Sequence, residues 1–390
     1  MKSILILFFL ILIAIPLMAQ EEISQYINQI KSELAPDKRT AIFSIEYRID
    51  GKNLTISGEV SEIEFKIILL KKLKSNYKYQ ITDEVNVLPD KKLGKKVLGI
   101  TKISVANIRS KPEHPAELAT QAILGTPVRV LKSQGPWYLI QTPDSYLGWV
   151  DHDGIELMTE EEFSAWSKKP KIIFTDMYGL VEDLESNTVI SDIVCGAILA
   201  KENETDEYYE VEFPDGRRGK IRKISAANYD SWADKLNFAP DYILQSAKKM
   251  VGFPYLWGGT SIKGIDCSGF TKTAFFQNGL VLPRDANQQA QIGEDVPFDK
   301  DLTQLIPGDL IFFGRKSDGV QSERISHVGI YLGAKLFIHS SGRVRIDSFQ
   351  KEHPNYNEFR FSTIVRIKRI LIPEQIEKIK ISNNKFYQAK

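Results

Sequence analysis

The hydrophobic and polar positions of this 390-residue chain change their pattern several times, which indicates several structural units. The first pattern is an almost unbroken apolar run over 4–17, preceded by Lys2 and followed by the small residue Ala19. This order is typical of a secretory signal peptide, and the run is shorter than the ~20 residues that a membrane-spanning helix needs. We therefore expect 1–19 to be removed on export; an uncleaved anchor is the alternative.

A mixed and charged region follows over 20–95, and its role is not predicted. Two apolar segments, 41–47 and 54–58, flank the turn Asp50-Gly51 and predict a β-hairpin. A lysine-rich stretch at about 61–74 predicts a helix after the hairpin.

Short apolar or aromatic strands separated by Pro, Gly and Asp turns then occupy two further segments, 96–160 and 168–230. The clearest strands are expected at 127–131, 137–141, 147–150, 208–213 and 219–221. Several short strands within about sixty residues predict a small β-barrel. The two segments share this pattern, so we expect two tandem barrels, which resemble bacterial SH3-like domains.

The pattern changes again over 235–370, where helices precede strands. Helices are predicted over 240–251 and from Cys267 to about residue 278, and the strands at 309–313, 326–332, 336–339 and 363–368. Helices followed by an antiparallel sheet indicate an α+β domain. Residues 371–390 are expected to form a polar C-terminal tail.

The composition is that of a soluble globular protein and narrows the possible partners. Lys and Arg number 51 and Asp and Glu 50, so the net charge of +1 gives no support for a nucleic-acid partner. The five His residues form no helical zinc pair, and no Cys-x-x-Cys occurs. We expect neither a metal nor another cofactor.

The two cysteines have different surroundings. Cys195 follows an apolar strand and is expected to be a small buried hydrophobe, so we predict no disulfide. Cys267 opens a predicted helix, where free N–H groups and the helix dipole favour a thiolate and should bring its pKa below ~8.5. A nucleophile also needs a base, and His327 and His339 lie on consecutive predicted strands. Each of the three could instead be structural.

The order of motifs around these residues makes a structural role for all three improbable. The motifs are Tyr255-Leu256-Trp257-Gly258-Gly259, Asp266-Cys267-Ser268-Gly269-Phe270, Leu282-Pro283-Arg284, Pro307-Gly308-Asp309-Leu310 and His327-Val328-Gly329-Ile330-Tyr331. This ordered set, over about 240–345, resembles the NlpC-type family of papain-like cell-wall cysteine peptidases. The resemblance implies a papain-like fold for the α+β domain.

The resemblance also implies roles for individual residues. Cys267 would be the nucleophile, His327 the general base and acid, and His339 the residue that orients His327. Tyr255 would help to bind the oxyanion, and Trp257 of the same loop would contact the substrate. For both aromatic residues, core packing is the alternative.

Two SH3-like barrels before such a domain resemble one subgroup, the γ-D-glutamyl-L-diamino-acid endopeptidases of murein peptides. In that subgroup the first barrel selects substrates with a free N-terminal L-Ala. The matching amine-site residues are Glu117, Tyr146 and Asp266, with Ser268 as a further substrate contact. A buried ammonium must be paired with an anion, which supports this set. For Glu117 the alternative is a solvated loop charge.

Two other functions are compatible with the sequence. The protein could bind cell wall without catalysis, or it could be an amidase or acyltransferase that uses the same thioester. We expect a monomer whose partner is a murein peptide, exported to the periplasm or the medium, without stable membrane insertion after cleavage of the signal peptide. The diamino acid and the stem length are not predicted.

Overall fold

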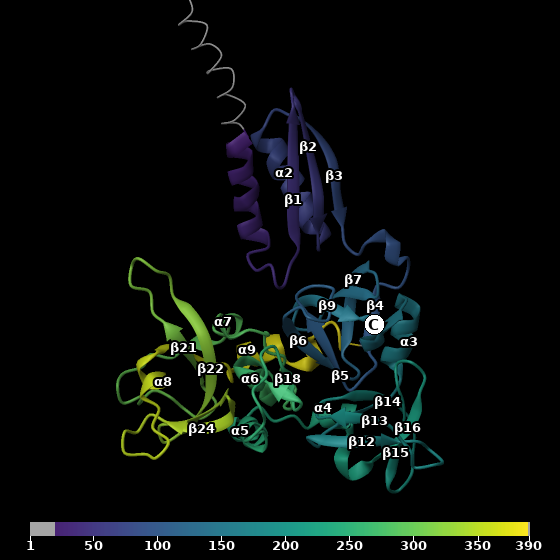
Figure 1. Ribbon diagram of the computed structural model, residues 1–390, viewed down its shortest axis with the longest axis vertical. Coiled ribbons are helices and arrows are strands. Elements are labelled where there is room, and N and C mark those ends of the chain that lie inside the picture. Colours follow the sequence, from purple (N-terminus) through teal and green to yellow (C-terminus); the bar gives the residue numbers. More distant parts are fainter. Residues whose placement is uncertain (1–19, 389–390) are drawn as a thin grey trace, which may run out of the picture. The chain divides into compact units, whose positions relative to one another are not determined.

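The structure is a computed structural model that describes residues 20–388, so the expected signal peptide at 1–19 lies outside the described residues (Figure 1). The chain divides into two units, Met1–Gly94 and Lys95–Lys390. No helix within 20–388 is long and apolar enough to cross a membrane.

The first unit is a three-stranded sheet covered by helices. A helix over 20–34 precedes β1 (Phe43–Asp50), β2 (Asn53–Val60), α2 (Ile63–Asn76), β3 (Gln80–Val87) and the short η1 (Lys91–Leu93). β1 and β2 pair antiparallel from Asp50↔Asn53, which confirms the predicted hairpin and helix. β3 adds parallel to β2, a pairing that the sequence did not predict. The fully buried Leu54 and Ile56 lie at the centre of its core.

The second unit begins with a seven-stranded sheet, here called the first β domain. Its order is β10-β4-β7-β8-β9-β5-β6, with β4 Leu98–Thr101, β5 Val105–Arg109, β6 Leu118–Ile123, β7 Pro127–Gln134, β8 Trp137–Gln141, β9 Leu147–Asp151 and β10 Ile155–Met158. The strands expected at 127–131, 137–141 and 147–150 are confirmed as β7, β8 and β9. A short η2 (His152–Gly154) precedes β10, and α3 (Glu160–Lys168) follows it.

A second seven-stranded sheet, the second β domain, follows α3. Its order is β13-β12-β16-β15-β14-β11-β17, with β11 Lys171–Phe174, β12 Tyr178–Glu182, β13 Val189–Val194, β14 Ile198–Glu204, β15 Tyr208–Glu212, β16 Arg218–Arg222 and β17 Ala226–Asn228. η3 (Lys223–Ser225) precedes β17 and α4 (Tyr229–Asp234) follows it.

The described residues contain no closed barrel, which corrects part of the predicted fold. Each seven-stranded sheet runs from one edge strand to another, β10 to β6 and β13 to β17. In the first β domain the edge strand β6 turns instead to the C-terminal domain, where Gln121 hydrogen-bonds to Thr260. An edge strand that is covered in this way is protected without closure of the barrel.

The C-terminal domain packs helices against a six-stranded antiparallel sheet, as predicted. Its sheet order is β20-β25-β21-β22-β23-β24, with β20 Glu294–Asp295, β21 Leu310–Arg315, β22 Arg324–Gly333, β23 Leu336–Ser341, β24 Arg343–Ser348 and β25 Ile364–Arg369. The other elements are α5 Pro240–Lys249, β18 Thr260–Ser261, β19 Gly264–Ile265, α6 Cys267–Phe276, α7 Ala286–Gln289 and α8 Glu358–Ser362. α5 and α6 cover one face of the sheet through buried Leu244, Phe270, Val328 and Ile330.

The last residues are not the polar tail that the sequence predicts. They form α9 (Pro373–Ile379) and η4 (Ile381–Asn383), and Ile381 is fully buried. Asn384 Nδ2 then donates a hydrogen bond to the carbonyl of Pro143 in the first β domain at 2.9 Å. Apolar side chains spaced between polar ones allow this segment to pack although its composition is polar.

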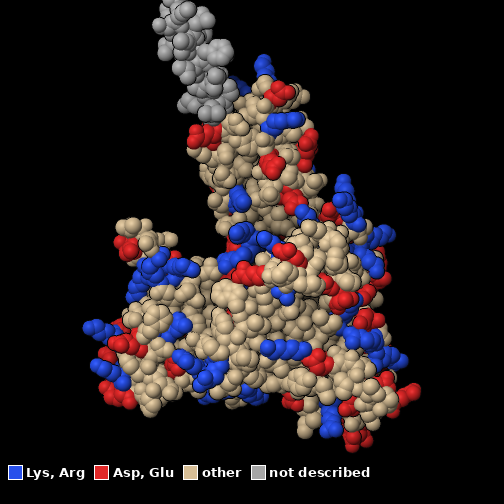
Figure 2. Space-filling view, viewed as in Figure 1, with Lys and Arg blue, Asp and Glu red and all other residues tan. Residues whose placement is uncertain are grey.

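Basic and acidic side chains are interspersed on the face shown in Figure 2. This agrees with the near-equal counts of 51 and 50. The described residues on this face therefore form no broad surface of one charge.

Candidate active site

Cys267 stands at the first position of α6, and its local sequence dictates that position. The carboxylate of Asp266 accepts a hydrogen bond from Gly269 N at 2.7 Å and caps the helix. Gly269 is required there, because a Cβ would lie 2.1 Å from the carbonyl oxygen of Gly259. The helix start thus places the sulfur where orphan N–H groups gather, as predicted.

Asp266 is held by a buried arginine. Arg284 approaches both of its oxygens, at 3.1 and 2.5 Å, and also donates to Ser268 Oγ at 3.0 Å. Gly258 N and Ser268 Oγ donate to the same carboxylate. A carboxylate offers about four acceptor positions, and protein donors occupy them all. The geometry therefore shows that Asp266 and Ser268 support the start of α6, and their expected contacts with the substrate stay predictions.

Three neighbouring strands carry a chain of hydrogen-bonded side chains. His327 on β22 contacts His339 on β23, with 2.7 Å between Nε2 and Nδ1. His339 Nε2 lies 3.0 Å from an oxygen of Asp347 on β24. The structure thus brings the two predicted histidines together and adds a carboxylate that the sequence analysis missed.

The ionisation of Asp347 determines which atoms donate and which accept in these hydrogen bonds. Burial alone would raise the pKa of Asp347, but hydrogen bonds from His339 and Asn357 outweigh burial and hold that pKa below its usual value. An ionised carboxylate only accepts, so His339 carries its proton on Nε2 and accepts at Nδ1. His327 then carries its proton on Nε2, which leaves Nδ1 free as a base.

The thiol of Cys267 is neutral at rest, contrary to the expectation of a thiolate. Burial raises its pKa to about 11, and the carboxylate of Asp266 acts in the same direction. Backbone N–H groups of Val328 and Ser268 oppose this shift without reversing it. Burial also lowers the pKa of His327 well below 6.5, so thiol and imidazole form an uncharged pair.

Tyr255 lies close to the sulfur. Burial raises the pKa of Tyr255 to about 12, and the charge of a Cys267 thiolate would raise it further. Its N–H donates to the Gly342 carbonyl at 3.0 Å, which fixes the loop against the turn between β23 and β24. Its phenol therefore stays protonated and can donate a hydrogen bond.

The first β domain places two polar side chains against the C-terminal domain. Trp257 Nε1 donates to Glu117 Oε1 at 2.7 Å, and Tyr146 Oη donates to Asp285 Oδ2 at 2.9 Å. Trp257 is 64% exposed, which excludes core packing for this residue. Asp285, partly exposed, is a second carboxylate at this junction that the sequence analysis missed.

The same two domains meet through a buried amide. Gln121 Oε1 accepts from Thr260 N and Ser261 Oγ, each at 3.0 Å. Gly258 has a φ of +80° and approaches Leu118 so closely that a Cβ would lie 2.0 Å from its carbonyl oxygen. The absence of a side chain at Gly258 therefore permits this close approach of the two backbones.

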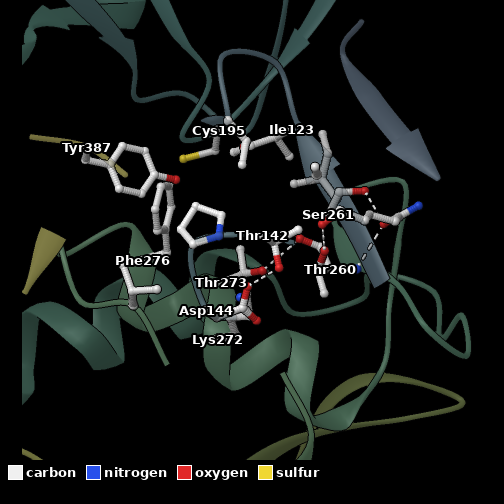
Figure 3. Close-up of a pocket in the computed structure, with 16 residues that line it drawn as sticks. Ile123, Thr142, Asp144, Cys195, Thr260, Ser261, Lys272, Thr273, Phe276 and Tyr387 are labelled. Carbon is white, nitrogen blue, oxygen red and sulfur yellow. Dashed lines mark hydrogen bonds and ion pairs between the residues drawn. The ribbon is translucent and has the colours of Figure 1, made fainter. Parts of the chain in front are cut away.

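A cavity of about 60 Å³ lies at the junction of both β domains and the C-terminal domain (Figure 3). Phe276 and Tyr387 lie beside each other at one end, and Thr260 and Ser261 lie at the other (Figure 3). None of its lining residues belongs to the cysteine and histidine site. Cys195, which is free and buried as predicted, lines the same cavity.

One buried ion pair closes this junction. Lys272 Nζ lies 2.5 Å from Asp144, and both side chains are largely buried.

Elsewhere in the described residues, Asp151, His152 and Asp153 are close enough to hold a metal ion. They lie apart from Cys267 in sequence and in domain, and acidic groups of this kind are common without an ion.

The residues that the sequence analysis missed lacked a distinctive motif. Asp347 lies on β24, the strand that follows the strand of His339. Only the register Phe337↔Asp347 brings it beside the hydrogen-bonded pair of His327 and His339. Arg284 ends a quoted motif and Asp285 follows it directly, but a loop sequence does not show that they contact Asp266 and Tyr146.

Comparison with known proteins agrees with this geometry. The sequence model of the NlpC/P60 family matches 252–363, and that of the bacterial dipeptidyl-peptidase Sh3 domain matches 108–155. A γ-D-glutamyl-L-lysine dipeptidyl-peptidase of Bacillus cereus is 32% identical over 62% of this chain and 73% of its own length. Dipeptidyl-peptidase 6 of Lysinibacillus sphaericus is 28% identical over 67% of this chain and 96% of its own length.

Solved structures show the same fold. A crystal structure of an NlpC/P60 family protein from Bacillus cereus aligns with a TM-score of 0.60 and 25% identity, over 70% of this chain and 100% of that one. An NlpC/P60 endopeptidase from Photobacterium damselae aligns with a TM-score of 0.53 and 17% identity, over 72% and 74%.

Fold and site together define a cysteine peptidase that acts on the cell wall. The chain belongs to the NlpC/P60 family, and its first β domain is an SH3-like domain. The second β domain has a sheet of the same size, and its SH3-like character stays a prediction.

Proposed function

We propose that the protein is an exported endopeptidase that hydrolyses the γ-D-glutamyl-L-diamino-acid bond of murein peptides with a free N-terminal L-Ala. The observation that carries the proposal is the relay from His327 through His339 to Asp347 beside a cysteine at a helix start. The name of the Bacillus cereus relative supports the choice of bond. The apolar run over 4–17 supports export.

In this mechanism Cys267 attacks the γ-carbonyl carbon while its proton passes to Nδ1 of His327. The tetrahedral oxyanion accepts hydrogen bonds from Cys267 N–H and Tyr255 Oη, each worth roughly 2.7–4 kcal/mol. The C–N bond breaks as His327 returns the proton to the leaving amine, and a thioester remains. His327 then removes a proton from water, whose oxygen attacks the thioester and releases the thiol.

The amine of the substrate would bind where the two domains meet. Glu117, Tyr146 and Asp266 remain the residues proposed for this site, and Asp285 is added as a further carboxylate. Asp285 is added because it is partly exposed and accepts a hydrogen bond from Tyr146 Oη at the junction of the two domains. A charged amine gains most from carboxylates that are close and partly desolvated.

Mass spectrometry of products tests this proposal. L-Ala-γ-D-Glu-L-Lys and its diaminopimelate counterpart should each be offered, and release of L-Ala-D-Glu is expected from at least one. Cys267→Ala should lower the rate at least about a thousandfold, while Cys195→Ala should leave it unchanged. Release of ammonia, or a product joined to an added amine, would identify an amidase or acyltransferase instead.

A further inference from the structure

Arg360 on α8 is a half-buried arginine beside the relay. Its backbone N–H donates a hydrogen bond to Asn357 Oδ1 at 3.0 Å, at the start of α8. Asn357 Nδ2 in turn donates to Asp347 Oδ2 at 2.6 Å. One asparagine therefore positions both Arg360 and the last member of the relay.

An aromatic ring supports the guanidinium of Arg360. Its central carbon lies 5.5 Å from the ring centroid of Phe313, and Phe313 lies 5.7 Å from the ring of His327. A cation on a ring face is held in place without consuming its N–H donors. The donors of Arg360 thus remain available close to the reacting centre.

Arg360 has no anionic partner of its own. Within 20–388 no side chain accepts a hydrogen bond from its guanidinium or forms an ion pair with it. The carboxylate of Asp347, whose charge acts on Arg360, already accepts from His339, Asn357 and Arg345. A partly desolvated cation without a partner is costly, which indicates that a ligand supplies the anion.

The surroundings of Arg360 carry an excess of positive charge. Burial lowers the pKa of Arg360 and the charge of Arg345 acts in the same direction, while the single ionised carboxylate of Asp347 opposes both. The thiol of Cys267 and the imidazole of His327 are neutral at rest, so neither compensates this charge. An anionic group of a bound peptide would compensate it.

We propose that Arg360 binds the free α-carboxylate of the γ-linked D-glutamyl residue. The inference rests on the proposed function, because only a γ-linked glutamate retains this carboxylate a few bonds from the scissile carbonyl. A planar guanidinium can donate two parallel hydrogen bonds to the two oxygens of a carboxylate. The sulfur of Cys267 is a single atom and cannot accept such a pair. Arg360 would thereby select the acid over its α-amide, the isoglutamine form.

Two peptides that differ in one group test this role. They are L-Ala-γ-D-Glu-L-Lys and the same peptide with the α-carboxylate amidated, and kcat/KM is measured for both. The wild type should prefer the acid at least about tenfold. Arg360→Gln should abolish the preference by slowing cleavage of the acid, and Arg360→Lys should retain part of it. Arg324→Gln, which removes an exposed charge from β22, should leave the preference intact.

The outcomes separate the two proposals. An equal loss on both peptides in Arg360→Gln and Arg360→Lys, with the preference kept, would show a purely structural role and overturn the inference. A wild type without preference would also overturn it while leaving the endopeptidase intact. Failure of the wild type to cleave either peptide would refute the proposed function itself.

Discussion

The indole N–H of Trp257 donates to the carboxylate of Glu117 at 2.7 Å, which links the C-terminal domain to the first β domain. The two residues are 140 positions apart in the chain. A charge from one domain is thereby fixed beside an exposed aromatic ring of the other. The proposed substrate site is therefore shared between domains, and its parts can be altered separately from the cysteine.

Glu117→Gln should weaken binding of peptides with a free amine, because the variant retains an acceptor for Trp257 but loses the charge. We expect kcat/KM to fall about 10- to 100-fold for the free peptide and to stay unchanged for its N-acetylated form. Steady-state kinetics on both peptides measures this. Glu113→Gln, in the same exposed loop, is the control. Equal turnover of free and acetylated peptides by the wild type would contradict the amine site.

Asp347→Asn should disable the relay without removing a nucleophile or base. An amide N–H pointed at His339 would reverse its tautomer, so Nδ1 could no longer accept from His327. We expect kcat to fall at least about a hundredfold with little change in KM. Stopped-time assays on the tripeptide give both constants, and His353→Gln serves as a control outside the relay. A variant with wild-type kcat would show that His339 needs no orienting carboxylate.

The uncharged pair of Cys267 and His327 should shape the pH dependence. His327 must be neutral to act as a base, and its lowered pKa means that the rate falls only well below pH 6.5. The thiol has a pKa of about 11, so iodoacetamide labelling should be slow at pH 7 and rise steeply above pH 9.

Both pH measurements use the Cys195→Ala protein, so that Cys267 is the thiol observed. An acid limb centred above pH 6.5 in kcat/KM would contradict the neutral imidazole. Fast labelling that does not change between pH 6 and 9 would indicate a thiolate–imidazolium pair at rest.

Arg284→Met should destabilise the C-terminal domain by about 3–5 kcal/mol, since it leaves the buried carboxylate of Asp266 without its main partner. The midpoint of urea unfolding, followed by tryptophan fluorescence, should therefore decrease. Lys378→Ala removes a partner from the exposed pair with Glu374 and should cost less than about 1 kcal/mol. A midpoint shift no larger than that of the control would contradict the stabilising role of the pair between Arg284 and Asp266.

Most elements could be predicted from the sequence because their signals are local. The strands with His327 and His339, the helix that begins at Cys267 and the first hairpin all follow from hydrophobic period and turn residues. Closure of a barrel depends on contacts between distant residues and could not be predicted in this way. The edge strand β6 pairs with β5 only, and its Gln121 contacts Thr260 of the C-terminal domain.

The site was predictable as far as motifs reach. The ionisation state of Cys267 could not be predicted from motifs. The helix start favours a thiolate, but burial opposes ionisation more strongly, and burial is not encoded in a motif. Asp266 illustrates the same limit. Its position beside the nucleophile did not show that Arg284, which is fully buried, hydrogen-bonds to its carboxylate.

The hydrogen bond from Asn384 to Pro143 has a consequence for the timing of synthesis. It joins residues 241 positions apart, so the first β domain leaves the ribosome long before the segment that fastens it. At ordinary rates of translation this interval is about 10 to 50 seconds. During that time the domain is held to the C-terminal domain only by contacts to residues made earlier, such as that of Gln121 with Thr260, and the bond from Asn384 can form only afterwards.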